Sequence, residues 1–127
     1  MKKYLLLLFG LVFFISYSFA QTTYYSQGTG NFSTLTNWDT NQGGGGSDPA
    51  TNDLINGSNT FIIQSGNTIT VDDSVNVSAL TVTGTLTIGN STTARNIVIN
   101  SSLTVDATGV LNVGSFNATH TIYLKVT

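Results

Sequence analysis

Thr83-Gly84-Thr85-Leu86-Thr87-Ile88-Gly89 governs the interpretation of this chain, because its pattern returns as Thr108-Gly109-Val110-Leu111-Asn112-Val113-Gly114. Gly109 follows Gly84 by 25 residues, and Gly114 follows Gly89 by the same 25. A fixed period of about 20 to 50 residues is typical of stacked repeats that bury their apolar faces against one another. In both copies, aliphatic residues alternate with more polar ones, which predicts short strands with one apolar face.

Similar short alternating runs follow one another from Thr60 onwards. Grouped by the 25-residue period, their aliphatic residues fall into three columns: Ile62, Leu86 and Leu111; Ile69, Ile97 and Ile122; Leu80 and Leu103. Three short strands per coil, with like strands stacked in parallel, are the plan of a right-handed parallel β-helix. We therefore expect an all-β solenoid of about two and a half coils of roughly 25 residues. The alternative is an antiparallel sandwich, but Asn-Gly or Asp-Gly hairpin pairs are missing between these runs.

The repeat also marks the residues expected to define a coil. Gly84 and Gly109 are expected at coil corners, where glycine tolerates a positive φ. The residues to which we assign a structural role are Trp38, Gly84, Gly89, Gly109, Gly114, Leu86, Ile88, Leu111 and Val113.

The chain divides into three segments. Residues 1–20 resemble a secretory signal peptide: Met1-Lys2-Lys3 is basic, residues 4–17 are almost wholly apolar, and Ser18-Phe19-Ala20 offers a small-x-small cleavage site before Gln21. A retained membrane helix is the alternative, and the cleavage site together with the lack of a basic flank after Ala20 disfavours it. We expect residues 21–59 to form an irregular N-terminal cap with a Gly-rich loop, and residues 60–127 to form the coils.

Charge and composition exclude several classes of partner. Without residues 1–20, Arg95 and Lys125 face six aspartates, so the net charge is −4. Two separated cations cannot neutralise a phosphate backbone, which argues against nucleic acid and anionic lipid as partners. There is no cysteine, so an exported chain of this kind lacks a disulfide framework.

Trp38 and the Gly-rich loop each permit two interpretations. An exposed Trp38 could stack on a sugar ring, whereas with Phe32 and Leu35 it would plug the open end of a stack, which is the interpretation we favour. The loop around residues 43–47 is rich in glycine, like loops that cradle phosphates. That use needs a following helix and usually a lysine, so we expect a flexible surface loop.

Catalytic residues are scarce. His120 is the sole histidine, and Arg95 and Lys125 stand alone in their columns, so we predict no enzymatic activity and no catalytic residue. Asp72 and Asp73, with Asn76 nearby, form a weak candidate for calcium. Because no spaced series of acidic ligands accompanies them, a solvated turn is the favoured interpretation and no cofactor is expected.

Tyr24-Tyr25-Ser26-Gln27-Gly28-Thr29-Gly30-Asn31-Phe32-Ser33, Asn37-Trp38, the Gly-rich loop and the runs through Leu80-Thr81-Val82 resemble the N-terminal segment of large secreted bacterial surface proteins. Those β-helical proteins are often exported by type IX secretion. The stretch is more distantly similar to the eight-glycine extracellular β domain. The resemblance implies secretion to the cell surface or beyond, and a structural, adhesin-like role.

Partners of such a module would be a glycan or another surface protein, which outward Thr and Asn side chains could contact. The strand pattern is still running at Val126-Thr127, so we also expect further coils of a longer parent chain. The alternative function is the N-terminal cap of a β-helical polysaccharide-degrading enzyme whose catalytic coils lie beyond these residues.

Overall fold

The computed structural model describes residues 20–89, 93–114 and 121–124, and this part of the chain is all-β, as predicted. No helix within it is long and apolar enough to cross a membrane. The signal peptide prediction concerns residues that lie almost wholly outside the described part. The elements are β1 (Thr23–Ser26), β2 (Gly30–Asn31), η1 (Leu35–Asn37), β3 (Trp38–Asp39), η2 (Thr51–Leu54), β4 (Thr60–Ile63), β5 (Thr68–Val71), β6 (Val75–Val82), β7 (Thr85–Ile88), β8 (Asn96–Val105), β9 (Val110–Val113) and β10 (Thr121–Leu124).

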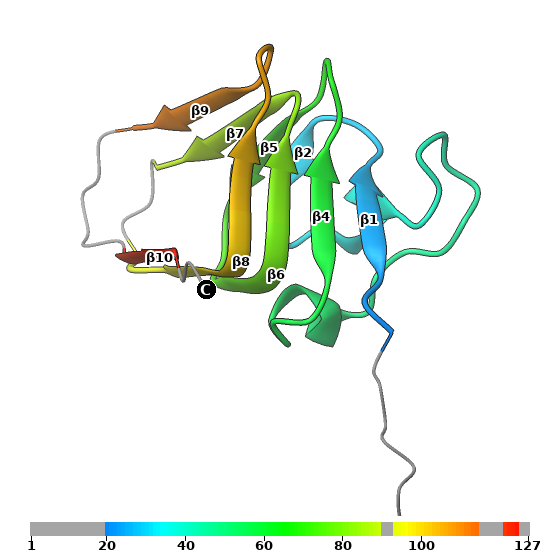
Figure 1. Cartoon of the computed structure of the whole chain (residues 1–127), viewed down its shortest axis with the longest axis horizontal. Helices are drawn as coiled ribbons and strands as arrows, with labels where there is room; N and C mark the ends of the chain where they lie inside the picture. Colours follow the sequence, from blue (N-terminus) through cyan, green and yellow to red (C-terminus); the bar gives the residue numbers. More distant parts are fainter. Residues whose placement is uncertain (1–19, 90–92, 115–120, 125–127) are drawn as a thin grey trace, which may run out of the picture.

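The strands form two sheets that face each other across the core (Figure 1). One sheet has the order β10-β8-β6-β4-β1-β3, and the other has the order β2-β5-β7-β9. Every pairing between described strands is parallel except that of β1 with β3. The larger sheet is therefore mixed, with its antiparallel pair at the N-terminal edge, and the smaller sheet is parallel throughout its described strands.

β6 and β8 each turn a corner, so the larger sheet has two sides. The register of β6 against β8 shifts between Val77 and Ala79, and both strands bend there (Figure 1). Their second halves continue the row of β1 and β4, while the first half of β8 pairs with β10. From β4 onwards, the chain runs in turn along one side of the larger sheet, the smaller sheet and the other side of the larger sheet, and we call each such pass a circuit. The first circuit contributes only β1 and β2 to these sides.

Like residues are stacked in several columns, as the repeat predicts. The register pairs Leu80 with Leu103, Leu86 with Leu111, and Ile97 with Ile122.

Two predicted column positions are wrong. Ile62 lies opposite Thr81 with its side chain half-buried, and Ile69 lies opposite Leu86. The cause is a circuit length that is not constant: Thr68 and Thr85 are 17 residues apart, whereas the next step in that sheet is 25. Corners can take up extra residues without disturbing the strands, so the period changes while the ladder continues.

The predicted boundary at residue 60 also needs correction. The region expected to be irregular contains β1 and β2, which pair in parallel with β4 and β5. Tyr24 and Ser26 are buried in the core, and Tyr24-Tyr25 is recognisable from the sequence as a possible short strand, whereas β2, with two residues, is too short to be recognised without its neighbour. The stack therefore begins at Thr23, and the irregular segment is confined to residues between β2 and β4.

Gly84 and Gly109 are required for a reason other than the expected one. Neither has a positive φ. A Cβ at Gly84 would instead overlap the backbone carbonyl oxygens of Gln64 and Asn67, and one at Gly109 would overlap that of Val82. Of the four glycines singled out from the repeat, only Gly89 has a positive φ, at 145°. The corners need glycine because successive circuits approach closely there.

Candidate functional site

The N-terminal end of the core is closed by aromatic side chains. Trp38 is fully buried, with its ring centroid 4.8 Å from Phe32 and 4.9 Å from Phe61, and its Nε1–H donates to the Phe32 carbonyl oxygen at 2.9 Å. Tyr24 stacks on Phe61 at 5.3 Å. A Trp38 ring without exposed surface has no face to offer a sugar, and its position is that of a plug.

Short elements cover the strand edges at the same end. β3 pairs with β1, and η2 lies against β6, where the Gly57 N–H donates to the Asn76 carbonyl oxygen at 2.9 Å. Leu54 of η2 is buried in the core. The outer edge of β1 and part of the outer edge of β6 are therefore occupied at this end, whereas β2 is the edge strand of the smaller sheet.

The Gly-rich loop is folded around Asp39, a carboxylate with 6% exposure. Its Oδ1 accepts the N–H of Asn41 at 2.6 Å and that of Gly46 at 2.9 Å. The side chain of Gln64 donates to the Gln42 carbonyl oxygen at 2.9 Å, which ties the loop to the second circuit. The backbone donors that a phosphate would require are thus partly taken by the chain's own carboxylate.

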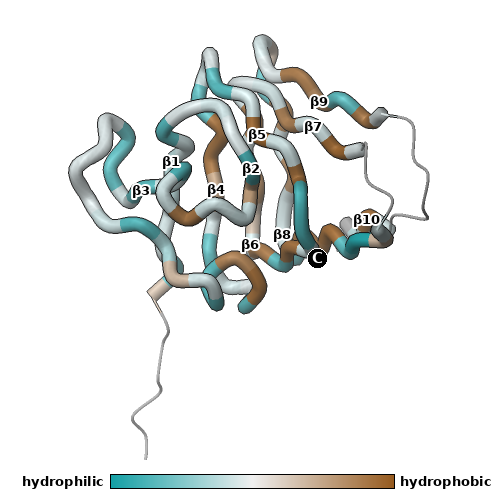
Figure 2. Tube along the Cα trace, turned by 180° about the vertical axis from the view of Figure 1, so that it is seen from behind, coloured by the Kyte–Doolittle hydropathy of each residue, from teal (hydrophilic) through white to brown (hydrophobic). Residues whose placement is uncertain are grey.

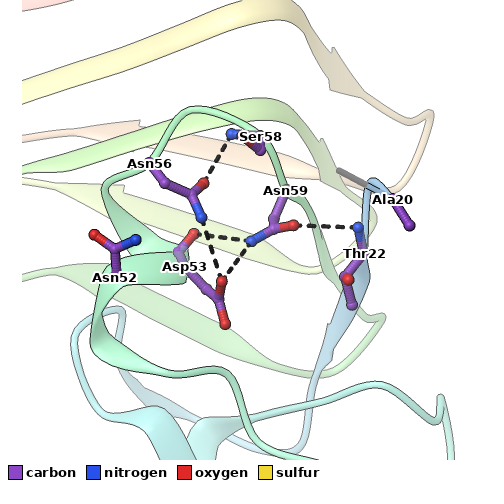
Figure 3. A pocket seen from close by; sticks show the side chains of 7 residues that line it. All are labelled: Ala20, Thr22, Asn52, Asp53, Asn56, Ser58 and Asn59. Carbon is purple, nitrogen blue, oxygen red and sulfur yellow. Dashed lines mark hydrogen bonds between the residues drawn. The ribbon is translucent and has the colours of Figure 1, made fainter. Parts of the chain in front are cut away.

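A polar pocket of about 450 Å³ lies beside η2 (Figure 3). It is lined by Ala20, Thr22, Asn52, Asp53, Asn56, Ser58 and Asn59. Asp53 accepts hydrogen bonds from the Tyr24 hydroxyl at 3.0 Å, the Ala50 N–H at 2.9 Å, and the Asn59 and Asn56 amides at 3.0 and 3.3 Å. Four donors match the acceptor capacity of one carboxylate, so Asp53 holds η2 in place and offers little to a ligand.

The Tyr24 hydroxyl faces this carboxylate from the core side. Burial raises the pKa of Tyr24 above the usual 10.0, the hydrogen bond to Asp53 and its negative charge raise it further, and a hydrogen bond with Thr22 opposes them. Tyr24 therefore remains a neutral donor under ordinary conditions.

Asp72 and Asp73 both accept hydrogen bonds from within the chain. Asp72 accepts the Ser33 N–H at 2.9 Å and the Ser33 hydroxyl, which joins the turn after β5 to the turn after β2. Asp73 accepts the Ser74 N–H at 2.7 Å. Among the described residues, no three His, Cys, Asp or Glu side chains gather where they could hold a metal ion.

Three other ionisable residues were singled out from the sequence. Arg95 donates from Nη1 to the Val71 carbonyl oxygen at 2.8 Å, so it bridges two circuits. Lys125 and His120 lie outside the described residues.

The opposite end of the core is an exposed apolar surface, which we call the end face. It is formed by the inward-pointing side chains of the last circuit: Leu103, Val105, Leu111, Val113 and Ile122. Leu111 and Val113, expected in the core, are 38% and 53% exposed, whereas their strand partners Leu86 and Ile88 are 1% and 3% exposed. Apolar segments, drawn in brown, lie along β7 and β9 (Figure 2).

The sequence indicated this surface only indirectly. Alternation in the last copy of the repeat identifies which side chains point inward, but it cannot say whether another circuit covers them. The position of β9 and β10 as edge strands supplies that information.

Comparisons with protein-family models, with curated proteins and with solved structures found no match to this chain.

Proposed function

We propose that this chain is a non-enzymatic structural module of an extracellular or cell-surface protein, built as the N-terminal end of a right-handed parallel β-helix. The observation that carries the proposal is the parallel stacking of like residues in register, from β1 at a closed end to β9 and β10. Stacked repeats of this kind present long, regular outer surfaces, which suit attachment and spacing outside the cell.

The use of the carboxylates supports a structural role. Asp39, Asp53, Asp72 and Asp73 accept hydrogen bonds that shape turns and loops, and Asp106 accepts the Thr83 hydroxyl at 2.8 Å between neighbouring circuits. A general acid or base needs a titratable group free to exchange a proton with a substrate. These groups are instead engaged in holding the fold.

The outer face of the smaller sheet supports an adhesive role. Thr68 lies beside Thr85 and Thr70 beside Thr87, with Asn112 next in the second row. Strands are about 4.8 Å apart, so these rows present regularly spaced, uncharged hydroxyl and amide groups. Such rows suit hydrogen bonding to a glycan or to another surface protein.

Disulfide trapping tests the β-helix, because the chain has no cysteine of its own. In the doubly substituted variant Thr87→Cys/Asn112→Cys, the two residues are direct register partners on the outer face. We expect rapid disulfide formation, since neighbouring Cα atoms in a sheet lie within the range that a disulfide spans.

The matched control is Thr85→Cys/Asn112→Cys, which is displaced by two residues along the strand. Its Cα separation is about 8 Å, beyond the reach of an unstrained disulfide. Equal trapping in both variants would contradict the proposed register. For the extracellular location, we expect the exported protein to begin at Gln21 by mass spectrometry; a cell-retained product that still begins at Met1 would refute secretion.

A further inference from the structure

The end face continues an interface that already exists inside the molecule. Val105 lies over Val82, and Leu111 and Val113 lie over Leu86 and Ile88. In each pair the residue of the earlier circuit is buried beneath the residue of the last circuit. The residue of the last circuit has no described residue covering it. The same contact, repeated once more, would bury the end face.

The backbone of the last circuit also presents unpaired groups. Val110 and Gly114 donate their N–H groups to the carbonyl oxygens of Gly84 and Ile88, both at 2.8 Å. In a parallel ladder successive residues bond to opposite sides, so the N–H groups of Leu111 and Val113 point away from β7. They face outward from the stack, where a next strand would lie.

This edge lacks charge and proline, two of the usual protections against pairing; the third, a bulge, is represented by the register shift of β8 against β6 at the corner. β8, β9 and β10 contain no charged residue and no proline. Edge strands that must stay unpaired are commonly blunted by charges, proline or bulges. An apolar face bordered by uncharged edges on three sides is built to be covered.

The path of the chain identifies the covering element. β6 and β8 each run along one side, turn the corner and continue on the next, where Ala79–Val82 and Ser102–Val105 lie side by side. β10 lies on the first half of β8 and points to that same corner. A strand continuing from β10 would reach the free edge of β8 at Ser102–Val105.

We propose that the end face binds one more parallel β coil of this repeat, formed by polypeptide that continues from β10. The inference rests on the proposed β-helix. The coil would place aliphatic residues over Leu103, Val105, Leu111 and Val113, at offsets of about 22 to 25 residues as in the preceding circuits. Its outward positions would carry polar side chains.

A second copy of the chain fits this surface less well. Head-to-tail stacking is opposed because Trp38 fills the other end of the core, and β3 and η2 occupy the edges of β1 and β6 there. Tail-to-tail contact about a two-fold axis would pair β8, β9 and β10 of one copy with the same strands of the other copy in antiparallel orientation. It would break the pattern of like residues over like that runs through the stack.

Appending a coil to the chain tests the proposal. Residues 103–127 are duplicated after Thr127 in a protein that begins at Gln21, so that the copy follows at the 25-residue period. The measurement is hydrogen exchange at the amides of Leu111 and Val113. We expect exchange at these two amides to slow by at least about 100-fold relative to the unextended chain.

The matched control is the same extension with its copies of Leu111 and Val113 changed to asparagine, Leu→Asn and Val→Asn. It keeps the length but loses the apolar contact, so both original amides should exchange as in the unextended chain. Unchanged exchange with the aliphatic extension would overturn the proposal. So would slow exchange in the unextended chain together with a dimer in sedimentation, because a second copy would then cover the face.

The disulfide assay separates this inference from the proposed β-helix. If Thr87→Cys/Asn112→Cys is trapped and the extension gives no protection, the docking inference alone fails. If neither occurs, the proposed β-helix itself fails.

Discussion

Gly84 offers the sharpest test of why the repeat contains glycine. Its N–H donates to the Ile63 carbonyl oxygen at 3.0 Å, and its own carbonyl oxygen accepts from Val110 at 2.8 Å, so it sits in a continuous ladder between circuits. A Cβ in Gly84→Ala would overlap the carbonyl oxygens of Gln64 and Asn67. Both are backbone atoms of the preceding turn, which cannot rotate away as a flexible side chain would.

The cost of Gly84→Ala follows from this geometry. Forcing an extra methyl into a packed site costs about 1–3 kcal/mol. Separating the two circuits would also lengthen one or two ladder hydrogen bonds, each worth about 1 kcal/mol. We therefore expect a loss of about 3 kcal/mol in the free energy of unfolding. With a urea m-value of about 1.5 kcal/mol/M, the midpoint falls by about 2 M.

Two further variants decide whether crowding is the cause. Gly28→Ala is the matched control, because an added Cβ there meets no atom within 4 Å and φ is not positive; its midpoint should change little or rise slightly. Gly84→Asn separates crowding from conformation, since asparagine tolerates positive φ better than alanine does. Crowding predicts that asparagine is at least as harmful as alanine. A midpoint for Gly84→Asn near that of the unchanged protein would refute the steric explanation.

Four other outcomes are expected. Trp38→Ala should lower the free energy of unfolding by about 3–5 kcal/mol in chemical denaturation, because a fully buried ring and its hydrogen bond are lost; a change below about 1 kcal/mol would contradict the plug. Because the folded-state pKa of Tyr24 is raised above 10.0, the stability it contributes is complete below pH 10.0 and is lost as the pH rises through the folded-state value. Tyr24→Phe should therefore reduce the fall in the free energy of unfolding above pH 10.0. Asp53→Asn should lower the pKa of Tyr24 only in part, because burial is the largest cause of the raised value. A Tyr24 pKa that ultraviolet titration finds unchanged in Asp53→Asn would contradict the role of Asp53. Calcium should leave the Tm unchanged because Asp72 is engaged by Ser33, and a calcium-dependent rise in the Tm would count against that assignment.

The sequence predicted the all-β class and the pairing of Leu86 with Leu111, because alternation and a repeated motif are local signals. It misplaced Ile62 and Ile69, because a constant period was applied to circuits of different length. The corner after β5 holds only residues 72–74, whereas residues 89–95 separate β7 from β8. Strand pairing sets the register, and corner length is free to vary, so no single period could place the early circuits correctly.

The candidate surfaces show the same division between local and non-local signals. Trp38 was expected to plug the core because large apolar residues were clustered near it in the sequence. The acceptor role of Asp39 within the Gly-rich loop was not foreseen, since its hydrogen bond to Gly46 spans seven residues without a regular element. The exposure of Leu111 and Val113 depends on which strands lie at the edge, and the alternating pattern is the same for a covered strand and an uncovered one.

The two ends of the stack differ in a way that gives the fold a direction. Aromatic rings gather in the first two circuits, where Trp38, Phe32 and Phe61 fill the end of the core. Their rings are tilted or edge-on to one another and do not lie parallel. Such a cluster closes a space but offers no flat row for another strand. From Leu80 onwards the described inward positions are aliphatic, and Leu80, Val82 and Leu86 each pair with an identical residue of the next circuit. In the proposed β-helix, these rings would close one end of the core, and the aliphatic ladder would offer one more coil a matching surface at the other end.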